Sequence, residues 1–236
     1  MRSILPGRLA PPRVAGVRKV AEEEPTCRYS AAMSSLWQRP ALDLLLATAS
    51  RAPTPGGGST AAVTAAFGTA LLEMALRITS KKNGQEGELA TMLDALTRLR
   101  ERLQALADED VRAFGEYVRA ARLPEGPERE EALGAAGGAS LEVPLEVART
   151  VRQTLEYAPR LPTWVHAEVT SDAGAGAAIL EGALHAALLT VEINLPHMAE
   201  EDRGALKAER DRLQARGTEL AAETRRLTYE RLRDRE

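Results

Sequence analysis

Apolar residues recur every three or four positions along most of the chain from residue 41 onward, and β-branched residues rarely alternate with polar ones. The first spacing is typical of amphipathic α-helices and the second of β-strands, so the pattern predicts an all-α fold. We expect six helices, at about 41–50, 59–80, 88–122, 127–157, 171–195 and 200–236. Short connections that carry Gly or Pro predict that neighbouring helices pack antiparallel in one bundle.

The predicted helix at 88–122 has one acidic residue within its apolar stripe. The stripe runs through Met92, Leu96, Leu99, Leu103 and Leu106 and resumes at Phe114, Tyr117 and Val118. Asp110 takes the position between, so it should face the bundle interior. A carboxylate held there is suited to general acid–base catalysis or to stabilising a cation. The alternative is structural, with Asp110 paired to an arginine or capping a neighbouring helix. Asp108 and Glu109 fall on other faces and should lie in solvent.

A glycine-rich turn, Pro53-Thr54-Pro55-Gly56-Gly57-Gly58-Ser59-Thr60, leads directly into an alanine-rich helix. Prolines keep the approach extended, glycines allow a tight turn, and Ser59 or Thr60 can cap the helix. A helix start of this kind carries partial positive charge and unpaired N–H groups, so it can hold an anionic or carbonyl-bearing ligand. The alternative is a helix-entry turn without a ligand. Neither a phosphate-loop ending nor GxGxxG spacing is present.

The predicted helix at 171–195 begins and ends with polar residues. Ser171 or Asp172 is a natural N-cap, and the residues behind them, Ala173 to Ala178, are small enough for close backbone packing. Asn194 precedes Pro196, where it can serve simply as a helix stop.

Composition excludes several classes of protein. The chain has 236 residues, 44% of them hydrophobic and 3% aromatic, with a net charge of −3. We expect one soluble, cytoplasmic helical domain that does not bind nucleic acid, since basic and acidic residues are interleaved. No apolar run approaches the roughly 20 residues that span a bilayer, so no membrane partner is expected. The single Cys27 and three histidines without HExxH spacing predict neither a disulfide nor a metal site.

Residues 1–38 differ from the rest of the chain, because they are rich in arginine and proline and lack a helical period. We interpret them as a disordered leader, followed by a helical domain at 39–236. The leader resembles an organelle transit peptide, and a start codon assigned too early, upstream of Met33, explains it equally well.

Together these segments resemble the cyclodeaminase/cyclohydrolase family of folate one-carbon metabolism, which includes formiminotetrahydrofolate cyclodeaminases and methenyltetrahydrofolate cyclohydrolases. The resemblance covers about residues 42–195. It rests on Pro53–Ser59, Arg77-Ile78-Thr79-Ser80-Lys81-Lys82, Asp108–Phe114, Val143-Pro144-Leu145-Glu146-Val147-Ala148, Ser171-Asp172 and Ile193-Asn194-Leu195.

The resemblance implies an all-helical homodimer that binds a tetrahydrofolate derivative as substrate, with no separate cofactor, in a cleft between helices. The implied reaction is ring closure of 5-formiminotetrahydrofolate with loss of ammonia, or hydrolysis of methenyltetrahydrofolate. Asp110 is then the catalytic carboxylate. The implied substrate-binding residues are Gly56, Gly57, Gly58, Ser59, Lys81, Lys82, Ser171, Asp172 and Asn194. Within this set, the two lysines would meet the glutamate tail of the folate.

Two positions depart from the family pattern. Val165-His166-Ala167-Glu168 stands where Gly-Asn-x-Asn is usual, and Thr190 stands where an asparagine is usual. Two amides that could hydrogen-bond the pterin are thereby replaced. A second hypothesis follows, that the chain is a catalytically altered helical dimer that binds a small ligand or a partner protein.

Overall fold

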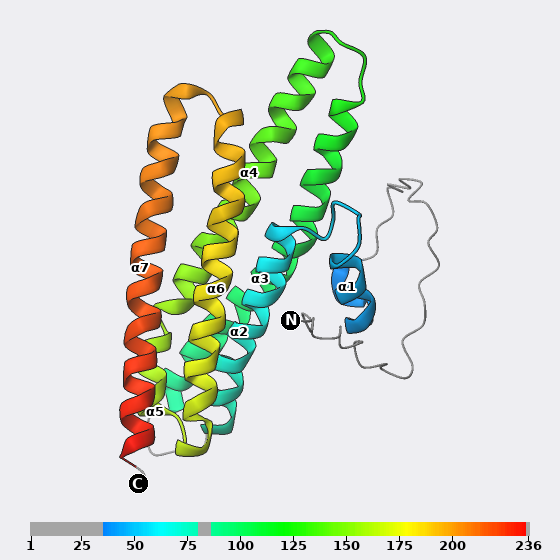
Figure 1. Ribbon diagram of the computed structural model, residues 1–236. Helices are drawn as coiled ribbons and strands as arrows, with labels where there is room; N and C mark the ends of the chain where they lie inside the picture. The colour runs from blue at the N-terminus through cyan, green and yellow to red at the C-terminus, as the bar shows by residue number, and fades with distance from the viewer. Residues whose placement is uncertain (1–34, 80–85, 235–236) are drawn as a thin grey trace, which may run out of the picture. The chain divides into compact units, whose positions relative to one another are not determined.

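The computed structural model describes residues 35–79 and 86–234, and this part of the chain is helical and contains no strand. The α-helices are α1 (Ala41–Thr48), α2 (Gly57–Thr79), α3 (Glu86–Ala121), α4 (Pro127–Leu155), α5 (Leu161–Trp164), α6 (Thr170–Asn194) and α7 (Glu200–Arg233) (Figure 1). Short 3₁₀ turns η1 to η4 cover Leu36–Gln38, Ala158–Arg160, Ala167–Val169 and Leu195–His197. The predicted all-α fold is confirmed. The sequence pattern missed only α5 and the 3₁₀ turns. Of these, η1 lies in the predicted leader, and the others lie in or at the edge of predicted connections.

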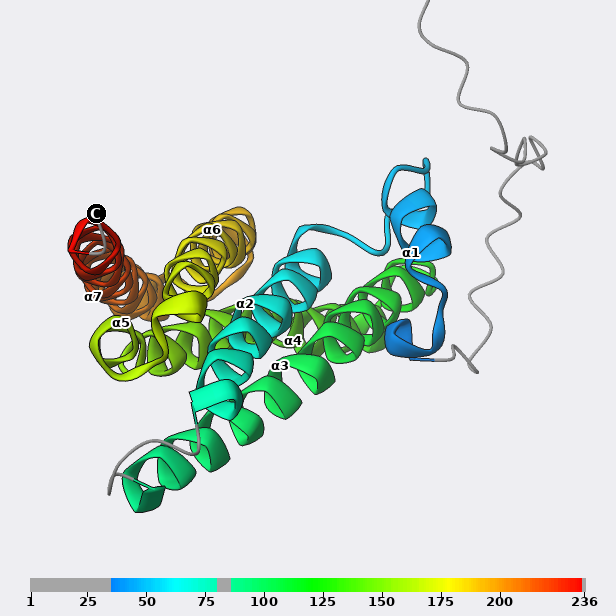
Figure 2. The ribbon, with the colours of Figure 1, turned by 90° about the horizontal axis from the view of Figure 1, so that it is seen from below.

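Five long helices form the bundle. α2 packs against both α3 and α6, and α4 packs against α3, α6 and α7 (Figure 2). Leucines and alanines fill the space between them, and Leu72, Leu96, Leu145 and Leu184 are completely buried. Apolar burial of this kind is the main favourable contribution to folding.

The α2–α6 contact is close because glycines meet there. A Cβ atom placed on Gly176 of α6 would lie 2.8 Å from the carbonyl oxygen of Gly68 on α2. A Cβ atom on Gly68 would lie 3.1 Å from the carbonyl oxygen of Gly176. These obstacles are backbone atoms, which cannot rotate away, so the crossing requires glycine at both positions.

The described residues before 39, where the helical domain was expected to begin, pack against α3. Leu36 in η1 is 2% exposed, and its N–H donates to Asp108 Oδ1 at 2.8 Å. Trp37 Nε1 donates to the carbonyl oxygen of Gln104 at 2.9 Å. Residues 35–38 therefore belong to the helical unit, and residues 1–34 lie outside the described part of the chain. The prediction that Asp108 is solvated is also wrong, because its carboxylate anchors η1 to α3.

Two helical segments, α2 and residues Ala167–His197, are long and apolar enough to cross a membrane by length and composition alone. The sequence analysis found no such segment, because threonines and glycines interrupt the larger apolar side chains. Core helices of soluble proteins pass the same test, and 56% and 50% of the most apolar 18-residue stretches of the two segments are buried inside the bundle. The outer faces of the two helices nevertheless present Phe67, Leu189 and Ile193, each more than 60% exposed.

We predict that Gly176→Ala lowers the free energy of unfolding by about 1–3 kcal/mol, because the added methyl group clashes with the α2 backbone. Gly182→Ala is the matched control on the same helix, since a Cβ atom there meets nothing within 4 Å. It should raise stability by up to about 1 kcal/mol through helix propensity alone. Urea denaturation checks both. Equal effects of the two substitutions would contradict the close crossing.

Candidate functional site

A cavity of about 310 Å³ lies where the N-terminal end of α2 meets α3, α4 and the C-terminal end of α6. Its lining comes from four segments of the chain that are far apart in sequence, at residues 53–58, 110–117, 140 and 190–197. The lining residues are Pro53, Thr54, Gly56, Gly57, Gly58, Asp110, Phe114, Tyr117, Ser140, Thr190, Ile193, Asn194 and His197. Of the predicted site residues, the cavity thus brings together Asp110, the three glycines and Asn194. Ser59 contacts it indirectly, through Asp110.

Asp110 faces inward from α3, as its place in the apolar stripe predicts. Its Oδ2 accepts a hydrogen bond of 2.7 Å from the backbone N–H of Ser59, in the first turn of α2. A Cβ atom on Gly58 would lie 2.1 Å from Asp110 Oδ1, so no side chain fits between the carboxylate and the α2 backbone. The structural alternative is therefore partly correct, because Asp110 also holds a neighbouring helix start.

Two opposing effects act on the Asp110 carboxyl. Burial raises its pKa above the ordinary value of 3.8, and the hydrogen bonds from the Ser59 backbone and side chain offset part of that rise. The balance is a raised pKa. A carboxyl group with a raised pKa is a better proton donor near neutral pH than an ordinary aspartate.

The α2 N-terminus differs in detail from the prediction. α2 begins at Gly57, two residues before the predicted start, and the N–H of Thr60 donates to the carbonyl oxygen of Gly56 at 3.0 Å. Ser59 does not cap from in front of the helix. Its Oγ lies in the first turn and accepts a hydrogen bond of 3.0 Å from the Gly56 N–H. Helix geometry leaves the amides of Gly57 and Gly58 without partners inside the helix, and both residues line the cavity.

Asn194 is more than a helix stop. Its Nδ2 donates to the carbonyl oxygen of Ser140 on α4 at 3.1 Å and to that of Thr190 at 2.8 Å. The neighbouring Thr190 directs its Oγ1 toward the Ala186 carbonyl, 3.2 Å away on the same helix. Asn194 thus links α4 to α6 at the edge of the cavity.

The remaining lining was not predicted as part of a site. Phe114 and Tyr117 continue the α3 stripe and were read only as core residues, although their position beyond Asp110 was a signal. Ile193 is 72% exposed and His197 is exposed. Aromatic and apolar walls with a few polar groups are typical of small-molecule sites.

Two predicted residues lie elsewhere in the described part of the chain. Ser171 and Asp172 are in the first turn of α6, about 33 Å along the helix from Asn194, so within one chain they do not line the cavity. The N-cap of α6 is Val169, which makes no side-chain capping bond, so the prediction that Ser171 or Asp172 caps this helix is wrong. Lys81 and Lys82 lie outside the described residues.

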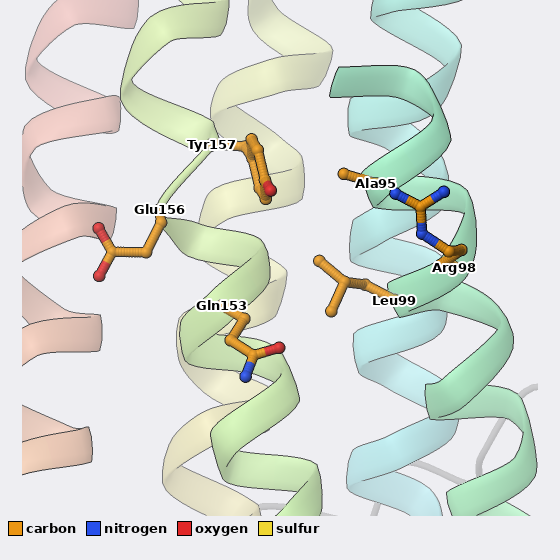
Figure 3. A pocket seen from close by; sticks show the side chains of 6 residues that line it. All are labelled: Ala95, Arg98, Leu99, Gln153, Glu156 and Tyr157. Atoms are coloured by element: carbon orange, nitrogen blue, oxygen red, sulfur yellow. The ribbon is translucent and has the colours of Figure 1, made fainter. Parts of the chain in front are cut away.

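A second hollow of about 380 Å³ lies between α3 and α4 and is lined by Ala95, Arg98, Leu99, Gln153, Glu156 and Tyr157 (Figure 3). It contains no residue from the motifs identified above. Its carboxylate, Glu156, already pairs with Arg216 at 2.9 Å and Arg152 at 2.9 Å, which lowers its pKa. We therefore take the Asp110 cavity as the candidate site. Residues 35–79 and 86–234 contain no cluster of three or more metal-ligating side chains.

Comparison with known proteins gives consistent matches. The family model of formiminotransferase-cyclodeaminase matches residues 40–212. A methenyltetrahydrofolate cyclohydrolase from Methylorubrum extorquens is 33% identical over 154 residues, which is 62% of this chain and 74% of the relative. A formimidoyltransferase-cyclodeaminase from Sus scrofa is 32% identical over 175 residues, or 71% of this chain, but the match spans only 32% of the relative.

A solved structure has the same fold. The crystal structure of formiminotetrahydrofolate cyclodeaminase from Thermotoga maritima superimposes with a TM-score of 0.75 at 24% identity. The match covers 82% of this chain and 98% of that one.

The raised pKa of Asp110 predicts a pH-dependent effect of Asp110→Asn on stability. The folded chain binds the Asp110 proton more tightly than the unfolded chain, so this carboxyl lowers stability as pH rises from 3.8 through its raised pKa. The variant should therefore gain stability relative to wild type across that range and keep the gain at pH 7. Urea denaturation at pH 3.5 and pH 7 measures the difference.

Asp108→Asn is the control from the same turn of α3. Its carboxylate is held by the Leu36 amide, and a neutral acceptor weakens that bond, so no gain is expected. A gain at pH 3.5 as large as that at pH 7 for Asp110→Asn would refute a raised pKa.

Proposed function

The chain belongs to the formiminotransferase-cyclodeaminase family, and on that premise we propose that it is a folate one-carbon enzyme that converts 5-formiminotetrahydrofolate to 5,10-methenyltetrahydrofolate with release of ammonia. The observation that carries this proposal is the Asp110 carboxyl, half-buried in the cavity with a raised pKa. The reaction requires a group of this kind, because it moves a proton between two nitrogens and forms a cation.

The proton transfers can be written with one carboxylate. N10 attacks the carbon of the protonated formimino group, a C–N10 bond forms, and the C=N electron pair moves to the exocyclic nitrogen. Asp110 accepts the N10 proton and delivers it to that nitrogen. Ammonia then leaves with the electrons of its C–N bond, and the positive charge remains on the methenyl bridge between N5 and N10. The ionised carboxylate stabilises this cation.

The cation also explains the second reaction of the family. Water can add to the methenyl carbon and give one proton to Asp110. One of the two C–N bonds of that carbon then breaks, its electrons go to the nitrogen, which takes the proton from Asp110, and the hydroxyl releases its remaining proton to solvent to leave a formyl group, which completes methenyltetrahydrofolate hydrolysis. The specific observation in favour of this second candidate is the similarity to the Methylorubrum extorquens cyclohydrolase over 74% of that protein's length. Both reactions use the same carboxylate at the same carbon.

The non-enzymatic hypothesis rests on the two departures from the family pattern. Residues 165–168 precede α6 and so lie at the end of this helix remote from the cavity, where the His166 N–H donates to Thr79 Oγ1 at 2.9 Å. Only Thr190 lines the cavity, and its hydroxyl is bonded to its own helix. The carboxylate, the glycine turn and Asn194 are all present, which favours the enzyme.

We further propose that the chain forms a homodimer through the outer faces of α2 and α6. These faces carry Phe67, Leu189 and Ile193, and exposed apolar surface that is continuous with a cavity is typical of an interface. A two-fold axis perpendicular to α6 would bring the first turn of α6 in one copy toward the cavity end of α6 in the other. Ser171 and Asp172 of the second copy could then approach the substrate, as the resemblance implies.

We predict that Asp110→Asn lowers the rate of ammonia release from 5-formiminotetrahydrofolate by about 10²-fold or more, because it removes the proton-carrying anion. Asp94→Asn makes the same change on an exposed position of α3 and should leave the rate unchanged. Isothermal titration with folinic acid tests ligand binding by both variants. If wild type binds folinic acid but releases no ammonia from 5-formiminotetrahydrofolate, the non-enzymatic hypothesis is favoured.

For the dimer, we expect light scattering at micromolar concentration to report twice the mass of one chain. Leu189→Glu should shift the mass to that of a monomer, because a charge in an apolar interface is costly. Tyr229→Glu is the control, since Tyr229 is also highly exposed, at 65%, but lies on α7. A monomeric wild type would overturn the proposed interface.

A further inference from the structure

Helix α4, which contributes Ser140 to the cavity wall, contains a proline in its interior. Pro144 is buried within α4 and has no N–H group to donate. In a regular helix the residue at 144 would donate to the carbonyl oxygen of residue 140. The proline therefore leaves the Ser140 carbonyl without its helical partner, and an unpaired buried carbonyl is unfavourable.

Asn194 of α6 provides the missing donor. Its Nδ2 lies 3.1 Å from the Ser140 carbonyl oxygen and 2.8 Å from that of Thr190. Both N–H bonds of the amide are thus directed at carbonyl oxygens, and the flipped orientation would place Oδ1 against them instead. The orientation of the amide is therefore determined, and Oδ1 is its one remaining polar group at the cavity wall.

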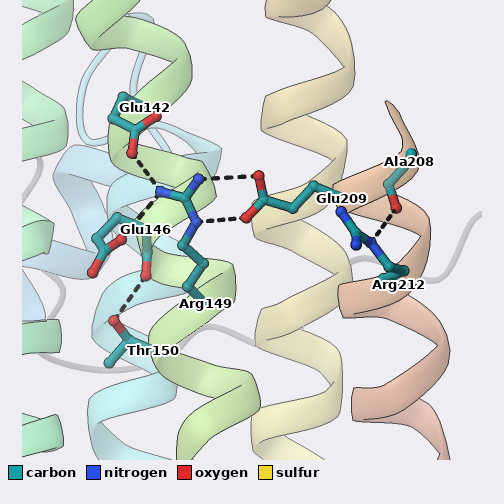
Figure 4. Close-up of polar contacts among 7 residues, drawn as sticks. All are labelled: Glu142, Glu146, Arg149, Thr150, Ala208, Glu209 and Arg212. Carbon is teal, nitrogen blue, oxygen red and sulfur yellow. Dashed lines mark hydrogen bonds and ion pairs between the residues drawn. The ribbon is translucent and has the colours of Figure 1, made fainter. Parts of the chain in front are cut away.

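The part of α4 that follows Pro144 is anchored to α7. Arg149, five residues after the proline, forms a bidentate pair with Glu209 of α7 at 2.7 and 3.1 Å (Figure 4). The same guanidinium contacts Glu142 and Glu146 on its own helix. These pairs connect α4 to α7, so the carbonyl that orients Asn194 belongs to an anchored segment.

We propose that Pro144 and Asn194 together form a specificity element that presents a fixed hydrogen-bond acceptor to the reacting one-carbon group. The proposal rests on the proposed function. Asn194 Oδ1 accepts an N–H of the 5-formimino group, and the Asp110 carboxylate in the same cavity adds a second acceptor and a negative charge. The 5-formyl group has an oxygen where the formimino group has its nitrogen. That oxygen has no hydrogen to donate, so it cannot form a hydrogen bond with either acceptor. A site built around fixed acceptors rejects such an analogue strongly.

The two residues have separate roles. Asn194 contacts the ligand, whereas Pro144 is a positioning residue that acts only through the Ser140 carbonyl. In Pro144→Ala the new N–H group can donate to that carbonyl, which frees the Asn194 amide to rotate. Discrimination between the two ligands should fall although no group that touches the ligand has changed.

Steady-state rates of ammonia release by the full-length chain test the proposal, with 5-formiminotetrahydrofolate as the substrate and 5-formyltetrahydrofolate as a competitive inhibitor, since they give an apparent dissociation constant for each compound. Wild type should bind the formimino compound about tenfold more tightly, the equivalent of one hydrogen bond. In Asn194→Leu the ratio of the two dissociation constants should fall to about one. In Pro144→Ala it should fall toward one. Pro127→Ala, the same change in the first turn of α4, should keep the wild-type ratio.

A double variant, Asn194→Leu with Pro144→Ala, distinguishes a lost ligand contact from a loss of folding. Asn194→Leu leaves the Ser140 carbonyl unpaired and should lower the melting temperature, and adding Pro144→Ala should restore part of the loss while the ratio stays near one. A purely structural role for Asn194 predicts that both ligands weaken equally with the ratio kept, which would overturn the proposal. A wild-type ratio in Pro144→Ala would overturn the role of the proline. Failure of wild type to bind either ligand would overturn the proposed function itself.

Discussion

The hydrogen bond between the Asp110 carboxylate and the Ser59 amide determines how the candidate site is built. It joins the middle of α3 to the first turn of α2, and it is possible only because Gly58 has no side chain. The bond satisfies one of the unpaired amides at the helix start and gives the buried carboxylate a donor. Without this hydrogen bond, nothing would offset the cost of removing the carboxylate from water, and the start of α2 would lose this contact with α3.

The other walls follow from equally local chemistry. Pro144 has no N–H group, so the Ser140 carbonyl on α4 lacks its helical donor. The Asn194 side chain on α6 donates to that carbonyl instead, which joins α4 to α6 beside the cavity. The glycine crossing of Gly68 and Gly176 brings α6 close to α2 further along the bundle. Two sequence motifs that look unrelated, one around Pro144 and one around Asn194, are therefore two halves of one contact.

Periodicity was sufficient for the fold and for Asp110, since both depend on which face of a helix a residue occupies. It located the six longer helices and placed Asp110 inward. It could not place Asp108, whose partner is the amide of Leu36, 72 residues away in sequence. The predicted helix at 171–195 already placed Ser171 and Asp172 at its start and Asn194 at its end, which is too far apart for one cavity within one chain. The family resemblance grouped them in one site because it orders motifs along the chain and not in space. Tyr117 was missed because core and cavity residues share the same helical spacing. His197 was missed because it lies in the 3₁₀ turn η4, beyond the predicted helix, where periodicity gives no signal.

The separation of the motifs along α6 bears on how the site could be completed. One chain supplies the carboxylate, the glycine turn and the oriented amide, which are the groups that act on the one-carbon unit in the proposed reaction. Beside them, Ile193 belongs both to the cavity lining and to the exposed apolar face of α6. An apolar residue at the junction of a cavity and a bare helix face loses its contact with water when a second chain covers that face. In the proposed dimer, the interface and the substrate cavity would then share one apolar surface. One chain would contribute the reactive groups, and the second chain would cover the cavity.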